Sequence, residues 1–154
     1  MGVEIERKYL VGDTGFLDGV EGIPYRQGYL STDPDRTVRI RRAGPHAYVT
    51  VKGRTHGATR AEFEYEIPVD DAEAMLELCL PPLIEKTRHR IEHAGRVWEV
   101  DVFDGANAGL VVAEIELPSE DADLELPAWV GAEVTDDRRY LNANLVAHPF
   151  SEWR

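Results

Sequence analysis

Apolar and polar residues alternate with a period of two over most of this sequence. Successive side chains of a β-strand point to opposite faces, so the alternation is typical of strands with two chemically different faces. Eight segments show it, and they span residues 2–11, 25–31, 36–43, 47–54, 61–68, 84–93, 96–103 and 111–118. AGPHA (43–47) and HAGR (93–96) contain Gly or Pro and are expected to form hairpin turns.

Two segments lack this alternation and are expected to be helical. The first begins at Asp70 or Asp71, continues through AEAMLELCL and ends at the two prolines that follow. The second begins at Thr135 or Asp136, continues through RRYLNANLV and stops before Pro149. Asp and Thr cap the first turn of a helix, whereas Pro ends it. Many short strands with few helices predict a mainly β (α+β) fold, an antiparallel barrel or sandwich.

The polar faces of these strands tend to carry charges of one sign. A solvated face is the ordinary explanation for any single strand, but such faces usually mix both signs with Thr, Ser and Gln. The repetition of acidic and basic faces predicts that they converge on a shared lumen, and about eight strands closed into a barrel can enclose a small ligand. The acids are Glu4, Glu6, Glu62, Glu64, Glu66, Glu99, Asp101, Glu114 and Glu116, and the bases are Lys8, Arg39, Arg41, Lys52, Lys86, Arg88 and Arg90.

Two features of such a lumen indicate which ligand it binds. The bases supply more positive charge than one carboxylate needs, and both Arg and Lys bind phosphate. Clustered carboxylates are hard oxygen ligands that suit Mg²⁺ or Mn²⁺. A metal ion would also relieve the repulsion between Glu4 and Glu6, which share one strand face. The residues therefore indicate a metal-chelated polyphosphate.

Length and composition argue against several other classes of protein. The 154 residues predict one domain over residues 1–154, and a net charge of -12 argues against nucleic-acid and membrane-surface binding. No apolar run is long enough to span a membrane or to serve as a signal peptide. Cys79 is the sole cysteine, so an internal disulfide is impossible. We expect a soluble, cytoplasmic protein with no nucleic-acid or membrane partner.

VEIERKYLV (3–11) resembles the ExExK signature of the CYTH superfamily, also called triphosphate tunnel metalloenzymes. TVRIRR, VTVKG, EFEYEI, EKTRHR, WEVDVFDG, GLVVAEIEL and EVTDDRRYLNANL follow in the family's order, so the resemblance extends to about residue 145. The chain is most similar to small bacterial single-domain members. The resemblance implies an eight-stranded antiparallel β-barrel that forms a tunnel with a charged lumen and a few flanking helices.

The resemblance also implies roles for individual residues. Substrate would be bound by Lys8, Arg39, Arg41, Lys52, Lys86, Arg88 and Arg139, the last in a C-terminal element that lines or closes the tunnel. Metal would be bound by Glu4, Glu6, Glu64, Asp101, Glu114 and Glu116, while Glu62 orients a base. The residues expected to act directly in catalysis are Glu4, Glu6, Lys8, Lys52 and Lys86. The alternation of polar and apolar residues, without the resemblance, adds Arg90 to the basic residues expected in the lumen or at its rim.

The activity implied is that of a metal-dependent triphosphatase that uses Mg²⁺ or Mn²⁺ and takes a triphosphate-containing small molecule. Small bacterial members resemble inorganic triphosphatases, which convert tripolyphosphate to diphosphate and phosphate. Nucleoside triphosphatase, thiamine triphosphatase and class IV adenylate cyclase activities fit the same tunnel, although Tyr25, Tyr29 and Tyr48 are expected to pack in its wall. A non-catalytic polyphosphate-binding module is a further alternative, against which the many acids argue. Relatives are often dimers, and apolar outer faces are compatible with a homodimer.

Overall fold

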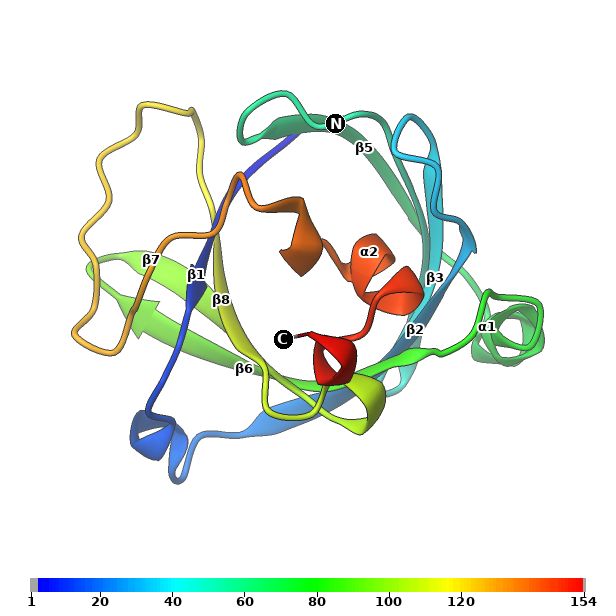
Figure 1. Cartoon of the computed structure of the whole chain (residues 1–154), viewed down its shortest axis with the longest axis horizontal. Coiled ribbons are helices and arrows are strands. Elements are labelled where there is room, and N and C mark those ends of the chain that lie inside the picture. Colours follow the sequence, from blue (N-terminus) through cyan, green and yellow to red (C-terminus); the bar gives the residue numbers. More distant parts are fainter. Residues whose placement is uncertain (1–2, 154) are drawn as a thin grey trace.

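The computed structural model describes residues 3–153, and its strands close into a barrel in the order β1–β5–β4–β3–β2–β6–β7–β8 (Figure 1). Every neighbouring pair is antiparallel. The strands are β1 (Val3–Leu10), β2 (Gly22–Ser31), β3 (Thr37–Ala43), β4 (His46–Lys52), β5 (Thr59–Glu66), β6 (Ile84–His93), β7 (Arg96–Phe103) and β8 (Val111–Glu116). Each overlaps one predicted strand, so the eight-stranded antiparallel barrel is confirmed.

The two expected hairpin turns join β3 to β4 and β6 to β7. Gly44 has a φ of 59° in the first turn, and Ala94 and Gly95 have φ values of 50° and 79° in the second. A two-residue hairpin with positive φ at both positions matches the right-handed twist of its strands. Gly95 is therefore well suited to its position, whereas Ala94 adopts a conformation that disfavours a side chain.

Both helix predictions are correct in place and partly wrong in extent. Helix α1 (Val69–Leu76) follows Pro68 rather than an aspartate cap, and it ends before the expected stop at the two prolines. The second divides into a 3₁₀ turn, η3 (Arg138–Tyr140), and a short helix, α2 (Asn142–Ala147). Leu141 between them is extended, with φ of -66° and ψ of 132°. The remaining 3₁₀ turns are η1 (Gly15–Leu17), η2 (Gly105–Asn107) and η4 (Phe150–Glu152).

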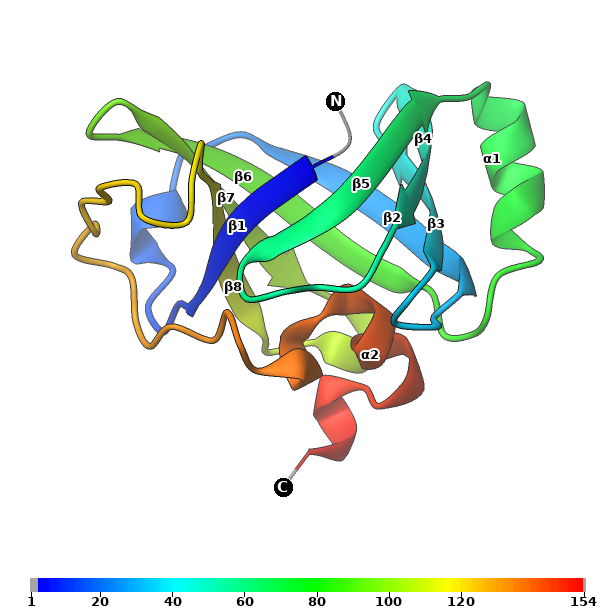
Figure 2. The same cartoon turned by 90° about the horizontal axis from the view of Figure 1, so that it is seen from above.

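Much of the apolar outer wall is covered by segments that pack against it. Helix α1 lies beside β3 and β4, where its Leu76 packs with the fully buried Ile40 (Figure 2). The segment after β8 covers β1, β7 and β8, and its Trp129 lies 5.6 Å from the ring of Trp98. Phe16 stacks on Trp129 at 4.3 Å. These contacts allow the barrel to point its charged side chains inward and its apolar ones outward.

The C-terminal segment closes one end of the barrel, where α2 lies across the opening in Figure 1 and below the strands in Figure 2. We call the apolar contacts there the closing cluster. It contains Tyr29, Ile84, Phe103, Leu110, Val112, Val134, Tyr140, Ala143, Leu145 and Val146. Because α2 is held by this cluster, the polar residues at its start are brought to the end of the lumen.

One part of the outer wall stays uncovered. Val51, Phe63 and Tyr65, from β4 and β5, have exposed fractions of 38%, 48% and 62%. The expectation of a homodimer would use such a face, and it stays a prediction. Within residues 3–153, none of the helices has the length and apolar character needed to cross a membrane.

Candidate active site

Inward side chains from all eight strands line a cavity of about 430 Å³, together with residues from the 138–144 segment. The alternation thus correctly predicted which strand face points into the lumen. Eleven of the thirteen expected metal-binding or substrate-binding residues line this cavity, namely Glu4, Glu6, Lys8, Arg39, Arg41, Lys52, Glu64, Lys86, Arg88, Glu114 and Glu116. The other two, Asp101 and Arg139, lie elsewhere.

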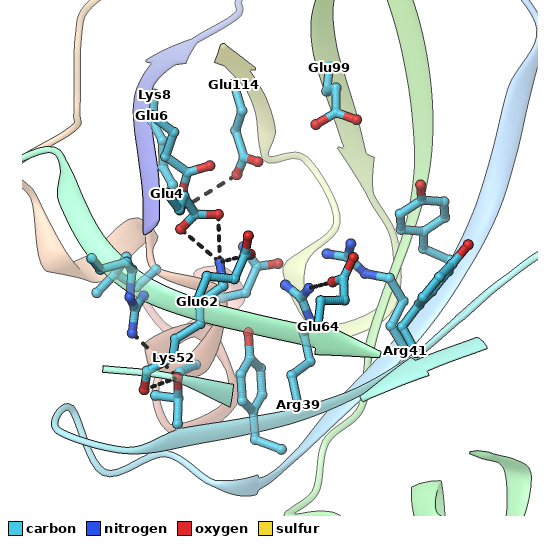
Figure 3. Close-up of a pocket in the computed structure, with 18 of the residues that line it drawn as sticks. Glu4, Glu6, Lys8, Arg39, Arg41, Lys52, Glu62, Glu64, Glu99 and Glu114 are labelled. Atoms are coloured by element: carbon cyan, nitrogen blue, oxygen red, sulfur yellow. Dashed lines mark hydrogen bonds and ion pairs between the residues drawn. The ribbon is translucent and has the colours of Figure 1, made fainter. Parts of the chain in front are cut away.

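Strand pairing brings the acids of β1 and β8 together. Glu6 is in register with Glu116, and Lys8 is in register with Glu114. The ammonium of Lys8 lies 3.8 Å from a carboxylate oxygen of Glu6 and 3.5 Å from one of Glu114 (Figure 3). Two strands far apart in sequence therefore form one acidic cluster, with a lysine inserted into it.

A second lysine holds the remaining acids of this wall. Lys52 donates to both carboxylate oxygens of Glu4 at 3.0 Å, and its ammonium lies 3.5 Å from Glu62 (Figure 3). The Glu62 contact agrees with its expected role of orienting a base. The Glu4 contact means that Lys52 screens charge on an acid expected to bind metal.

The two lysines do not remove the repulsion within the acidic cluster. Burial, together with the nearby carboxylates of Glu114 and Glu4, raises the pKa of Glu6 to about 7. Burial and the neighbouring acids also raise the pKa of Glu116. By contrast, although burial opposes it, Lys8 helps to lower the pKa of Glu114 to about 2. The lumen thus contains carboxylates whose charged forms are insufficiently compensated by the protein.

The donor chemistry of this cluster fits a hard divalent cation, because Glu4, Glu6, Glu114 and Glu116 offer carboxylate oxygens from two adjacent strands. Within residues 3–153, however, no three acidic, His or Cys side chains already converge closely enough to hold a metal ion. The lysine contacts explain this arrangement, since Lys8 and Lys52 occupy the carboxylate oxygens. Binding a cation would require those side chains to turn away from the lysines.

The opposite side of the lumen carries bases that are held in different ways. Arg39 donates to Glu64 at 3.2 Å and to Thr50 at 3.1 Å, so Glu64 engages a base (Figure 3). Arg41 forms no carboxylate contact within the described residues. Its Nε donates instead to the side-chain oxygen of Gln27 at 2.9 Å.

Arg41 lies in an electrostatically unfavourable place. Burial and the nearby charges of Arg39 and Arg88 lower the pKa of Arg41 to about 10. The ring of Tyr25 partly offsets this, since the guanidinium carbons of Arg41 and Arg88 each lie 4.9 Å from its centroid. A partly buried arginine among like charges, held by a neutral amide, is an arrangement that favours an anionic ligand.

Asp101 is fully buried behind two of the bases. Its oxygens accept from Nε and Nη2 of Arg88 at 2.8 and 2.9 Å, and one lies 2.8 Å from the ammonium of Lys86. These cations hold the pKa of Asp101 well below its usual value, although burial acts in the opposite direction. The geometry supports a role in positioning Lys86 and Arg88 better than the expected role in metal binding.

Arg139 points away from the lumen. It pairs with Asp137 at 2.7 Å, and its guanidinium lies 4.9 Å from the ring centroid of Trp153. The expected contact with substrate is therefore not supported, and Arg138 lines the cavity instead. Arg90 lies at the rim, where its side chain is 64% exposed and 3.3 Å from Glu99.

Sequence reasoning assigned no role to Gln27 and Asn142. Gln27 is fully buried, and its amide nitrogen donates to the side-chain oxygen of Asn142 at 3.3 Å. Lys86 donates to the same oxygen at 3.0 Å. Alternation along residues 25–31 could have placed Gln27 on the lumen face, but no local pattern links it to Asn142.

Comparison with known proteins adds independent information about this chain. The family model described as "CYTH domain" matches residues 2–147. A protein of Acetivibrio thermocellus named inorganic triphosphatase is 49% identical over 155 residues, covering 100% of this chain and 99% of the relative. Another, from Nitrosomonas europaea and with the same name, is 40% identical over 147 residues, covering 92% and 95%. A crystal structure of an inorganic triphosphatase has a TM-score of 0.64 and 36% identity, and the alignment covers 93% of each chain.

Proposed function

This chain belongs to the CYTH domain family, and from that premise we propose that it hydrolyses inorganic tripolyphosphate to diphosphate and phosphate. One observation carries the proposal: a single cavity combines a cluster of four carboxylates with a partly buried arginine that has no carboxylate partner among the described residues. The names of the two relatives support the choice of substrate. The activity is that of a phosphoanhydride hydrolase.

The acidic cluster would hold a divalent cation, Mg²⁺ or Mn²⁺, through Glu4, Glu6, Glu114 and Glu116. Such an ion neutralises phosphate charge and lowers the pKa of a bound water. The raised pKa values of Glu6 and Glu116 agree with this assignment, since burial and then the neighbouring carboxylates disfavour their charged forms. Lys8 and Lys52, which already contact these acids, would then be free to donate to phosphate oxygens.

The bases would bind and orient the triphosphate. Arg41 supplies a guanidinium that no carboxylate of the described chain neutralises, and Arg39 lies beside it. Asp101 holds Lys86 and Arg88 in fixed positions, which reduces the reorganisation needed when charge develops on the transferred phosphoryl group. Catalysis by this set consists of positioning and charge stabilisation.

Two of the three tyrosines considered as platforms for a base are already engaged, whereas Tyr48 lines the cavity. Tyr25 already has two guanidinium groups beside its ring, and Tyr29 is buried in the closing cluster. Neither ring is available to stack on a nucleobase or a thiazole. Binding of the phosphate chain alone does not need such a platform.

Phosphate release tests the proposal. Purified protein would be assayed with tripolyphosphate, ATP, thiamine triphosphate and diphosphate, each with Mg²⁺, Mn²⁺ or excess EDTA, and the products examined for cyclic AMP. We expect metal-dependent cleavage of tripolyphosphate with the highest kcat/KM and no activity in EDTA. Tight binding of tripolyphosphate without turnover under any metal condition would instead identify a polyphosphate-binding module.

A further inference from the structure

We propose that Asn142 is a further substrate-binding residue, whose side-chain amide is oriented so that its nitrogen donates to a phosphate oxygen of the triphosphate. The inference rests on the proposed function, because it assumes a phosphate chain in the lumen. Asn142 begins α2 and lines the cavity together with Arg41 and Lys86. It comes from the C-terminal segment, whereas Arg41 and Lys86 come from strands β3 and β6.

A chain of hydrogen bonds joins Asn142 to two of the bases. Arg41 donates from Nε to Oε1 of Gln27 at 2.9 Å, and Nε2 of Gln27 donates to Oδ1 of Asn142 at 3.3 Å. Nζ of Lys86 donates to the same Oδ1 at 3.0 Å. A single oxygen of α2 therefore accepts from two neighbouring strands, β2 and β6.

The orientation of the Asn142 amide follows from which atoms in this series of hydrogen bonds can donate and which can accept. A guanidinium has no acceptor, so the atom of Gln27 that faces Arg41 must be its oxygen. The other end of the Gln27 amide is then a donor, and the atom of Asn142 that receives it must be Oδ1. Fixing the oxygen also fixes Nδ2, which must point away from both partners.

The nitrogen that remains is free to bind a ligand. Within residues 3–153, Nδ2 of Asn142 forms no hydrogen bond with the protein, although Oδ1 accepts two. An amide N–H pair that lines a cavity among arginines and lysines is suited to an acceptor such as a phosphate oxygen. Phosphate offers acceptors and no obligatory donor, so it matches the orientation that Gln27 imposes.

The neutrality of the two amides is part of the argument. A carboxylate at position 27 or 142 would hold Arg41 and Lys86 equally well, but it would also cancel the positive charge that attracts phosphate. Lys86 already has Asp101 at 2.8 Å as an anionic partner. Gln27 and Asn142 therefore orient the bases without further reducing the charge of the lumen.

The experiment compares Asn142→Asp with Asn142→Ala. The aspartate keeps an oxygen for Gln27 and Lys86, but it replaces the N–H donor by a second negatively charged oxygen. The alanine removes both the donor and the acceptor. Ala147→Asp, at an exposed position of the same helix, controls for added charge. Affinity for tripolyphosphate would be measured by calorimetry in EDTA, and KM and kcat with Mg²⁺ or Mn²⁺.

Direct binding by Nδ2 makes Asn142→Asp the weaker binder of the two. We expect its Kd and KM for tripolyphosphate to rise by at least about tenfold, since a charged hydrogen bond is replaced by like-charge repulsion. Asn142→Ala should lose less, and Ala147→Asp should stay within about twofold because solvent screens its charge. Binding by Asn142→Asp that stays close to wild type, despite the added negative charge and the lost N–H donor, overturns the inference.

A measurement on the unaltered protein guards against a variant that does not fold. The side-chain amide resonance of Asn142, assigned by its loss in Asn142→Ala or by sequential connectivity, should shift when tripolyphosphate saturates the protein in EDTA. An unchanged resonance at saturation overturns the inference. If wild type cleaves tripolyphosphate but the expected order of variants fails, only this inference is wrong. If wild type neither binds nor cleaves tripolyphosphate, the proposed function fails and the inference with it.

Discussion

Two kinds of cation line the lumen, and they differ in what holds them. Lys8, Lys52 and Arg88 contact carboxylates, so part of their charge is neutralised inside the protein. Arg41 contacts a neutral glutamine, so no carboxylate neutralises its charge. Burial and the charges of Arg39 and Arg88 disfavour its charged form. Residues of the first kind can exchange partners when a cation and a phosphate enter together, whereas Arg41 has no internal partner to give up.

Loss of one carboxylate that we propose to bind metal should separate catalysis from folding. In Glu4→Gln, the pair with Lys52 is weakened but Lys52 keeps Glu62 at 3.5 Å, so the barrel should remain intact. We expect metal-dependent kcat/KM to fall by at least about a hundredfold, because metal stabilisation of developing charge is worth several kcal/mol. Steady-state kinetics with circular dichroism checks both points.

The matched control for this change is Glu66→Gln. Glu66 is an acid of β5 rather than of β1, and it contacts His46 at 2.9 Å and is largely exposed. Its replacement should leave kcat/KM unchanged. Full activity of Glu4→Gln in saturating Mg²⁺ would contradict the assignment of Glu4 as a metal ligand.

The raised pKa of Glu6 predicts a dependence of stability on pH. The folded protein binds a proton at Glu6 up to about pH 7, whereas the ordinary pKa is 4.5. Between these values the folded state holds more protons than the unfolded state, so the contribution of Glu6 to the unfolding free energy falls as pH rises through this window. In Glu6→Gln, this decrease of the unfolding free energy with rising pH should be absent.

Urea unfolding in EDTA measures the effect. The stability of Glu6→Gln relative to wild type should increase by about 3 kcal/mol from pH 4.5 to pH 8. Adding a divalent cation at pH 8 should stabilise wild type more than the variant. A stability difference that does not change with pH would show that Glu6 titrates normally.

At the scale of elements, α1 contributes to stability from outside the barrel. Leu76 is 3% exposed and packs on the outer face, away from the lumen side chains. Leu76→Ala should lower the unfolding free energy by about 2–5 kcal/mol through the cavity it leaves. Leu78→Ala, at a position that is 76% exposed, should change it by less than about 0.5 kcal/mol.

Both variants should keep the KM of wild type at a temperature where they are folded. Denaturant unfolding and tripolyphosphate kinetics provide the two measurements. A marked rise in KM for folded Leu76→Ala would mean that α1 shapes the lumen through β3 and β4.

The predictive power of the sequence differed between kinds of element. Strands were predicted well because a period of two fixes which side chains share a face, and this placed Glu4, Lys8 and Arg41 in the lumen. The C-terminal segment was predicted less well. Arg138 and Arg139 are adjacent, and only the 3₁₀ turn with Asp137 as its cap decides that Arg138 lines the cavity. The hydrogen bonds of Asn142 depend on how α2 packs under the barrel, which no local pattern encodes.

At the scale of the whole molecule, the lumen should be stabilised by an anion even without metal. On the proposed function, tripolyphosphate would bind the folded barrel and would find no comparable site in the unfolded chain. At a concentration of a hundred times Kd, linkage predicts a gain of about 2.7 kcal/mol. We expect thermal melts in EDTA to show a higher midpoint with tripolyphosphate than with orthophosphate at equal ionic strength.

An equal midpoint with the two anions would contradict this prediction. Arg41→Gln is the informative variant, because it removes the guanidinium that lacks a carboxylate partner. In this variant, tripolyphosphate should raise the melting temperature by less than it does in wild type. The melting temperature of the ligand-free variant should not be lower than that of wild type.

The outward-facing apolar wall has an evolutionary consequence. Residues that keep the barrel folded, such as Ile40, Trp98 and Leu76, pack on the outside of the wall, whereas most residues that meet a ligand face inward. Mutations that alter recognition therefore change few of the contacts that maintain the scaffold. Such a separation gives a lineage wide freedom to acquire new substrates by drift and selection while its architecture persists.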